Sequence, residues 1–263
     1  MKIDFKTPMT FYELLAIILA AIAIVIPIAQ AAWKRWLIKP KLNFLPTGRA
    51  TLFFNQSGSY LRVDGVYEAE NKPIALKNVS VTVIRKKDEQ KLNLSWSSFI
   101  SPVNQNVVGN YLQTTESAHP FRIEADSIAT AFIEFGDPFD SFGKTFKSYT
   151  APLFDNIPNI KKINNCYKEA LQQYMKSSDY TSARTHLEEE FFWKIGQYSV
   201  EIVAEYGETS KLFQYDISIG EYEHNYLAHN IDEALLSPLK RAYGIAWDYH
   251  TAYVELFAKL KRG

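Results

Sequence analysis

The sequence predicts a mainly β protein with added helices, joined to a single N-terminal membrane helix. Three observations predict it. An apolar run from Phe11 to Trp33 has no ionisable side chain after Glu13. Residues 42–135 contain several runs that alternate or are rich in β-branched and aromatic residues, as strands are. Residues 229–263 have apolar residues at helical spacing.

The apolar run is long enough to cross a bilayer. Its length of about 23 residues corresponds to about 34 Å of helix. Thr10 and Glu13 have the spacing of a capping box, in which each side chain accepts a bond from a free backbone N–H of the first turn. A proline is tolerated near the exit, and aromatic rings favour the two interfaces. The residues assigned to the anchor and its interfaces are Thr10, Tyr12, Glu13, Pro27, Trp33, Lys34, Arg35 and Trp36.

Basic residues predict the orientation of this helix. Lys34, Arg35, Lys39, Lys41 and Arg49 follow the run, and no acid follows it before Asp64. The positive-inside rule then places the N-terminus outside and residues 34–263 in the cytoplasm, at the inner (cell) membrane.

The alternative is a signal peptide followed by an exported, periplasmic domain. Lys2 and Lys6 would form its basic region, and Ala29-Gln30-Ala31 resembles a cleavage site. The length of the run, Glu13 at its start and the basic residues directly after it favour an uncleaved anchor.

Cysteine usage and charge exclude some classes of protein. Cys166 is the single cysteine, so no disulfide can form within the chain, and a reducing compartment fits. Of the 29 basic and 29 acidic residues, six and two lie in residues 1–41, so the remainder has four more acids than bases. A mildly acidic domain argues against nucleic acid as a partner.

Strands are predicted from alternation and from the turn residues that bound each run. The clearest has valines two apart at Val79, Val81 and Val83, which places them on one face of a sheet. A later pair of runs flanks the turn at Gly207-Glu208 and predicts a hairpin. The predicted strands are 50–55, 60–71, 79–85, 91–96, 121–124, 129–135, 196–206 and 211–219.

Two parts of this region resemble bacterial immunoglobulin-like domains. Around the first turn the resemblance rests on Asn71, Pro73, Asn78 and the three alternating valines. The second part is Tyr198, which resembles the tyrosine corner of such domains, although Lys194 stands where an Asp is usual. The resemblance implies a β-sandwich over residues 42–228, and a sandwich by itself implies no function.

Residues 136–195 are predicted to be an insertion between strands. Residues 136–157 are rich in Gly, Pro and Phe and predict a loop, and 160–175 have the spacing of a helix. Residues 181–192 fit a short helix or the start of a strand. Long insertions of this kind often carry the specific part of a function.

The C-terminal segment, residues 229–263, is predicted to be helical. Asn230 and Glu233 repeat the capping-box spacing, and Ser237-Pro238 offers a second helix start. The apolar residues then follow heptad steps, which fit either docking on the sheet or self-association. A stripe of alanines on the membrane helix is a further self-association candidate. These residues are Leu239, Ala242, Ala246, Tyr249, Tyr253 and Leu256, with Ala16, Ala20 and Ala23 on the membrane helix.

No catalytic residue, metal ligand or cofactor is predicted. Gly143-Lys144-Thr145 lacks the glycine-rich loop of a phosphate site, and Ser141 with Lys144 lacks any partner motif. His186 with Glu190, and His224 with Asn225 and His229, do not form a three-ligand zinc pattern.

Two functions are compatible with these features. The first is a non-enzymatic, membrane-anchored binding or scaffold module that recognises a protein or a small ligand. The second is an oligomerising effector that perturbs the bilayer, since the layout resembles small bacterial proteins of which some accompany anti-phage systems. An enzyme with a site in the insertion ranks third.

Overall fold

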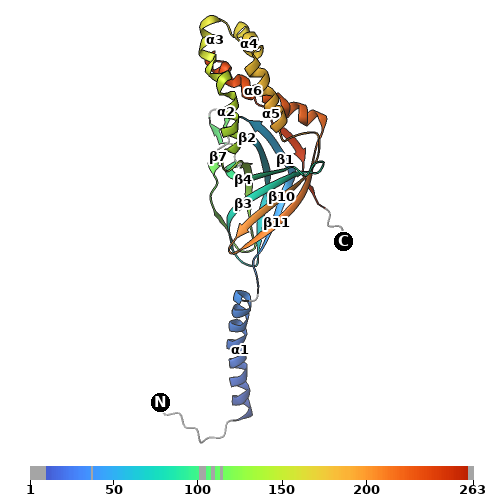
Figure 1. Ribbon diagram of the computed structural model, residues 1–263. Coiled ribbons are helices and arrows are strands. Elements are labelled where there is room, and N and C mark those ends of the chain that lie inside the picture. Colours follow the sequence, from blue (N-terminus) through green and yellow to red (C-terminus); the bar gives the residue numbers. More distant parts are fainter. Residues whose placement is uncertain (1–9, 37, 101–104, 108–109, 113–114, 260–263) are drawn as a thin grey trace.

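The structure is a computed structural model that describes residues 10–36, 38–100, 105–107, 110–112 and 115–259. A separate N-terminal helix leads into a β domain, and a layer of helices covers the end of that domain away from the first helix (Figure 1). The helices are α1 Phe11–Trp36, α2 Ser141–Asp155, α3 Ile157–Ile163, α4 Tyr167–Met175, α5 Ser178–Glu190 and α6 Glu221–Ala242.

The strands account for most of residues 41–136 and return near the C-terminus. They are β1 Lys41–Asn55, β2 Gly58–Glu70, β3 Ile74–Arg85, β4 Lys91–Ile100, β5 Gln105–Val107, β6 Asn110–Leu112, β7 Thr115–Ser117, β8 Phe121–Ile123, β9 Ser127–Gly136, β10 Gly196–Tyr206, β11 Thr209–Ile219, β12 Ala252–Glu255 and β13 Phe257–Ala258. Each strand predicted from the sequence is found.

Helix α1 has the start that the sequence predicts. The Thr10 N–H donates to Glu13 Oε2 at 2.8 Å, and the Glu13 N–H donates to Thr10 Oγ1 at 3.4 Å. The helix continues through Pro27 to Trp36. Within Phe11–Trp33, an 18-residue window has a mean hydropathy of 2.7, and no residue of that window is buried. Lys2 and Lys6, and the side chains of Lys34, Arg35 and Trp36, lie outside the described part.

The main sheet is antiparallel and nearly closed. Its strand order is β12-β1-β2-β9-β4-β3-β10-β11-β13, with β7 added to β4 and β8 to β3. Because β12 and β13 are consecutive in the chain, both ends of this order meet in the C-terminal segment. The sheet is therefore barrel-like. A sandwich has two facing sheets, and the described strands apart from the β5-β6 hairpin belong to one continuous sheet.

The first strand begins earlier than the sequence predicts. Pro46 and Gly48 are typical turn residues, so the sequence predicts a start at residue 50. Instead β1 begins at Lys41, and its register with β2 shifts between Pro46 and Ala50. Gly48 has φ 84°, which glycine adopts at little cost in such a bulge.

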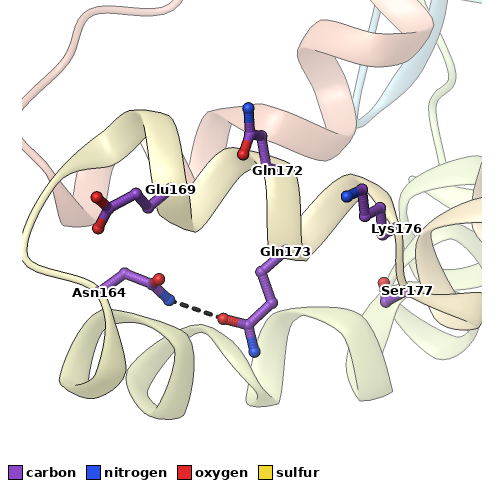
Figure 2. Close-up of a pocket in the computed structure, with 6 residues that line it drawn as sticks. All are labelled: Asn164, Glu169, Gln172, Gln173, Lys176 and Ser177. Atoms are coloured by element: carbon purple, nitrogen blue, oxygen red, sulfur yellow. Dashed lines mark hydrogen bonds between the residues drawn. The ribbon is translucent and has the colours of Figure 1, made fainter.

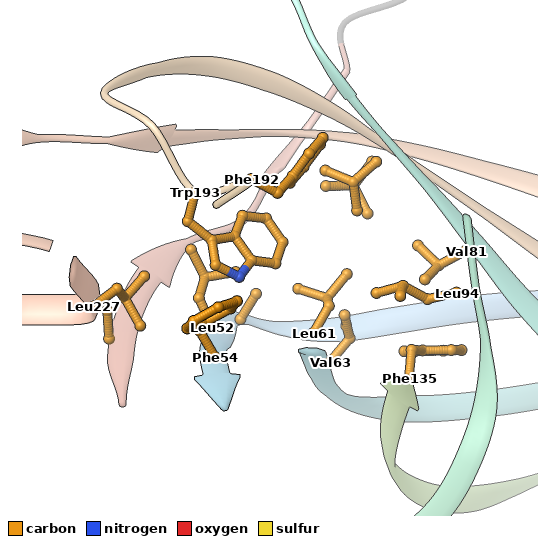
Figure 3. Packing of buried hydrophobic residues seen from close by; sticks show 14 of the residues in the cluster. Leu52, Phe54, Leu61, Val63, Val81, Leu94, Phe135, Phe192, Trp193 and Leu227 are labelled. Carbon is orange, nitrogen blue, oxygen red and sulfur yellow. The ribbon is translucent and has the colours of Figure 1, made fainter. Parts of the chain in front are cut away.

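Side chains fill the interior of the sheet. Leu52 and Phe54 from β1 and Leu61 from β2 lie in one cluster with Trp193, which enters from the segment after α5 (Figure 3). Trp193 is fully buried, and its indole N–H donates to the Phe53 carbonyl at 3.1 Å. This bond fixes the end of the helical insertion to β1.

The Tyr198 hydroxyl bonds back to the chain, as the sequence predicts. The Tyr198 hydroxyl lies 2.6 Å from the Lys194 carbonyl oxygen, to which it donates, and 3.1 Å from that of Phe192. The hairpin of β10 and β11 is also confirmed, with Gly207 at φ 56° in its turn.

The insertion is helical, and the predicted loop at 136–157 is wrong for most of its length because α2 occupies Ser141–Asp155. Asp137 starts this helix: its carboxylate accepts from the N–H groups of Ser141 at 2.6 Å and Phe142 at 3.1 Å. Burial alone would raise the pKa of Asp137, but these bonds and the one from Phe139 lower it. The predicted helix at 160–175 is split into α3 and α4, and α5 confirms the helical alternative for 181–192.

The predicted C-terminal helix is wrong beyond residue 242. Helix α6 already begins at Glu221, whose N-terminal neighbour Gly220 donates its N–H to Glu223 Oε2 at 3.0 Å. Asn230, Glu233 and Pro238 lie inside this helix, so neither predicted start is a helix start.

The heptad seam is therefore absent from the described residues. Leu239 and Ala242 end α6, with Leu239 buried. Ala246 and Tyr249 lie in a loop, while Tyr253 belongs to β12 and Leu256 follows it. Gly244, at φ 69°, breaks the helix. Leu260 lies outside the described part.

Buried tyrosines predict a loss of stability in alkali. Burial raises the pKa of Tyr198 and of Tyr215 to about 12. In the unfolded chain a tyrosine titrates near pH 10. Below pH 10 the contribution of both neutral hydroxyls is fully present, and as the pH rises from 10 through 12 it is lost, since the unfolded state releases the proton more easily. Urea titrations at pH 7.5, 8.5 and 11.5 should give equal midpoints for the first two and a lower one for the third.

Candidate functional site

Stacked rings cover one side of α6 and the loop that follows it. Tyr222, Tyr226 and His229 lie on one side of the helix because they are spaced by four and three residues. The His250 ring of the loop stacks on Tyr226 at 4.2 Å and on His229 at 4.4 Å between ring centres. Tyr222 stacks on Tyr226 at 5.7 Å with a 12° angle between the planes. We call Tyr222, Tyr226, His229, Trp247 and His250 the aromatic face.

This face is open to solvent. Tyr222 is 73% exposed and Trp247 is 51% exposed. The Arg241 guanidinium lies over the Trp247 ring, 5.4 Å from its centre. Exposed rings of this size, with a cation over the Trp247 ring, have the geometry for stacking and cation–π contacts with a partner.

Two buried polar residues of α6 hold the loop in place. Asn230 is fully buried, and its amide donates to the carbonyl oxygens of Phe54 at 3.0 Å and His250 at 2.7 Å. Its own oxygen accepts from the His250 N–H at 2.7 Å. Glu233 accepts from the Asp248 N–H at 2.8 Å. The pair that looks like a capping box in the sequence therefore holds the backbone at residues 248 and 250.

Glu233 also makes a buried ion pair. The Lys240 ammonium lies 2.5 Å from Glu233 Oε2, and the two side chains are 17% and 2% exposed. One carboxylate thus binds both a cation of its own helix and a backbone N–H of the loop. Asn230 and Glu233 therefore fix the backbone of the loop at residues 248 and 250.

The loop brings together residues that sequence reasoning did not connect. Candidate ligand atoms of His229, Asp248 and His250 all lie within 4.8 Å of one another. In the sequence His229 stands near His224 and Asn225, but in the structure His224 Nδ1 lies 2.9 Å from the Trp193 carbonyl oxygen and bonds to it. The spacing of Asp248 and His250 is the sequence signal that could have indicated this cluster. Two residues that are two positions apart lie on the same side of the chain when its backbone is extended.

The other candidate residues from the sequence are either exposed or bound to neighbouring groups of the fold. Lys144 Nζ donates to the Phe139 carbonyl at 2.9 Å, and Ser141 is exposed at the start of α2. His186 stacks on Tyr149, whose hydroxyl donates to Glu190 at 3.3 Å. Cys166 is exposed at the start of α4.

The helical layer contains an open pocket of about 480 Å³ (Figure 2). Amide and charged side chains line it, and Asn164 Nδ2 donates to Gln173 Oε1 at 2.7 Å across it. Because of this bond, two of the polar groups in the pocket already bind each other. Among the lining residues, no nucleophile is hydrogen-bonded to a base. They are Asn164, Glu169, Gln172, Gln173, Lys176 and Ser177.

On α1, the alanine stripe is open. Ala16, Ala20 and Ala23 are exposed, as are Tyr12 and Trp33 at the two ends of the apolar segment. No domain residue covers this helix among those described.

Comparisons with known proteins give no family. No family model matches the chain, and no curated protein matches it. Among solved structures, the chain is similar to a family 123 glycoside hydrolase from Clostridium perfringens, reported for glycolipid glycan hydrolysis, at 12% identity and a TM-score of 0.28. The match covers 69% of this chain and 27% of that enzyme, so the chain spans less than a third of the enzyme's length. A TM-score this low carries no argument, and the immunoglobulin-like resemblance stays a prediction.

Proposed function

We propose that this protein is a non-enzymatic binding module, anchored in the inner membrane by α1, that holds a protein partner on its aromatic face. The observation that carries the proposal is an exposed set of rings whose backbone is fixed by buried Asn230 and Glu233. The proposed orientation has the N-terminus outside and the β domain in the cytoplasm, as the basic residues after the helix predict.

The residue types favour a protein as the partner. Tyr, Trp and Arg carry a large share of the binding energy at protein interfaces. Rings that already stack on one another lose little freedom on binding, which lowers the entropic cost of association. Helix α6 lies at the end of the β domain away from α1, where a bilayer would not obstruct access (Figure 1).

Membrane anchoring can be tested at the centre of α1. Replacing Ile22 by arginine places a charge near the middle of the apolar segment, at a cost of about 2.5–3.5 kcal/mol for insertion. We expect the variant to shift from the carbonate-resistant membrane fraction to the soluble or aggregated fraction, whereas Ile22→Leu stays in the membrane. N-terminal sequencing of the membrane form separates an anchor from an exported domain: a chain that starts near Ala32 and is free of lipid would contradict anchoring.

Partner binding can be tested with paired surface variants. The double variant Tyr222→Ala/Trp247→Ala removes two exposed rings that make no core contact, and we expect it to lose proteins that co-purify with the wild type after crosslinking in cells. Phe139→Ala is the matched control, because Phe139 is 74% exposed and lies outside the aromatic face. Equal recovery from all three chains would contradict the proposal.

A second candidate function is an oligomerising membrane effector. Exposure of Ala16, Ala20 and Ala23 on α1 favours it, since small residues let membrane helices approach closely. Its expected signature is a homo-oligomer in detergent that dissociates when Ala16 and Ala20 become leucine.

A further inference from the structure

We propose that His229, Asp248 and His250 bind one divalent transition-metal ion of the zinc type. Their candidate ligand atoms lie within 4.8 Å of one another, and His250 Nε2 is 3.5 Å from Asp248 Oδ2. Around tetrahedral zinc, ligand atoms at about 2.1 Å from the ion are about 3.4 Å apart. Closing the remaining distance requires rotation of the His229 and Asp248 side chains, both of which are exposed.

The backbone under these ligands is fixed before any ion binds. The Asp248 N–H is held by Glu233 and the His250 N–H by Asn230, two residues that lie one turn or less from His229 on α6. The loop backbone at Asp248 and His250 is therefore held next to His229 on α6. Preorganisation of this kind removes much of the entropic cost that a flexible loop would add to metal binding.

The ligand atoms are free of competing strong bonds. Among the described residues, His250 Nε2 has the Asp248 carboxylate at 3.5 Å as its polar contact, and the other ring nitrogen, Nδ1, is buried and is not the ligand atom. The Asp248 carboxylate is exposed, and its Oδ2 lies 3.5 Å from His250 Nε2. His229 is exposed and contacts His250 through its ring. The stacked arrangement of the two rings has to tilt for both nitrogens to reach one ion, and the exposed ring of His229 has space to do so.

The ligand set selects the class of metal. Two imidazoles and one carboxylate suit Zn²⁺, Co²⁺, Ni²⁺ and Cu²⁺, whereas Mg²⁺ and Ca²⁺ prefer oxygen ligands alone. Three protein ligands leave a fourth position, and His229 and Asp248 are both exposed, so this position faces solvent.

The test uses the full-length chain without a histidine tag, solubilised in detergent and freed of metal with a chelator. Zn²⁺ is titrated by calorimetry, and Co²⁺ is followed by its visible absorption, which reports imidazole ligands and coordination number. We expect one ion per chain. His229→Ala and Asp248→Asn should each weaken binding by at least about tenfold and change the Co²⁺ spectrum.

His186→Ala is the matched control, because His186 is an exposed helical histidine that stacks on a tyrosine as His229 stacks on His250. It should bind as the wild type does. Thermal unfolding of the metal-free variants checks that each is folded, and both substituted side chains are exposed. Absence of one-to-one binding by the wild type, or equal affinity in the wild type and both ligand variants, would overturn the proposal.

Discussion

Replacing Trp193 by alanine should lower the free energy of unfolding by about 3–5 kcal/mol, the usual range for removing a large buried ring. Trp193 is fully buried and lies 5.2 Å from the Phe192 ring and 6.0 Å from the Tyr198 ring, centre to centre. Its removal leaves a cavity between the sheet and the insertion, and it leaves the Phe53 carbonyl oxygen without its indole donor.

Urea unfolding, followed by near-ultraviolet circular dichroism of the detergent-solubilised chain, measures this loss. Trp247→Ala is the matched control, since this tryptophan is half exposed and should change the free energy of unfolding by less than about 1 kcal/mol. If the two variants unfold at the same urea concentration, Trp193 does not connect the insertion to the core in the way described.

Local pattern was enough to predict the strands. In β3, Val79, Val81 and Val83 are all buried, as their spacing of two requires. Helix α1 was equally predictable, because a run with no charge over some five turns has few alternatives. The hydrogen bond from Tyr198 back to the chain was also predictable, since Tyr198 and its acceptor at Lys194 are only four residues apart.

Closure of the sheet was not predictable from local pattern, because residues 249–256 satisfy two periods at once. Tyr249, Tyr253 and Leu256 fit the heptad steps of a helix. Ala252, Val254 and Leu256 fit the alternation of a strand, and these three are buried while Tyr253 is 68% exposed. Pairing with β1, some 200 residues away, decides between the periods. Gly244, at φ 69°, is the local signal that ends the helix before these residues.

Prediction of the candidate site depends on the same choice between helix and extended chain after residue 242. On a helix, residues 248 and 250 would point about 200° apart, so the predicted helix places them on different sides. In the loop they share one side and meet His229. Asn230 and Glu233 have capping-box spacing for a different reason: three residues apart on α6, they both face the loop and bind its backbone.

Replacing Lys240 by methionine should lower the free energy of unfolding by about 3 kcal/mol or more. Glu233 is 2% exposed, and without the ammonium its charge stays buried with the Asp248 N–H as its remaining donor. Removal of one partner of a buried ion pair is costly because the other charge is left uncompensated. The measurement is the same urea titration, and hydrogen exchange at the Asp248 and His250 amides should accelerate as the loop loosens.

The double variant Glu233→Gln/Lys240→Met decides whether charge or shape is responsible. Glutamine keeps the oxygen that accepts from Asp248, and methionine keeps the length of the lysine stem, while both charges disappear. Replacing both partners of a buried pair is often neutral, so the double variant should recover most of the stability that Lys240→Met loses. With the wild type, Lys240→Met and the single variant Glu233→Gln, it forms a double-mutant cycle, which isolates the interaction between the two side chains. Additive losses in that cycle would mean that Glu233 stabilises the loop through the Asp248 bond alone.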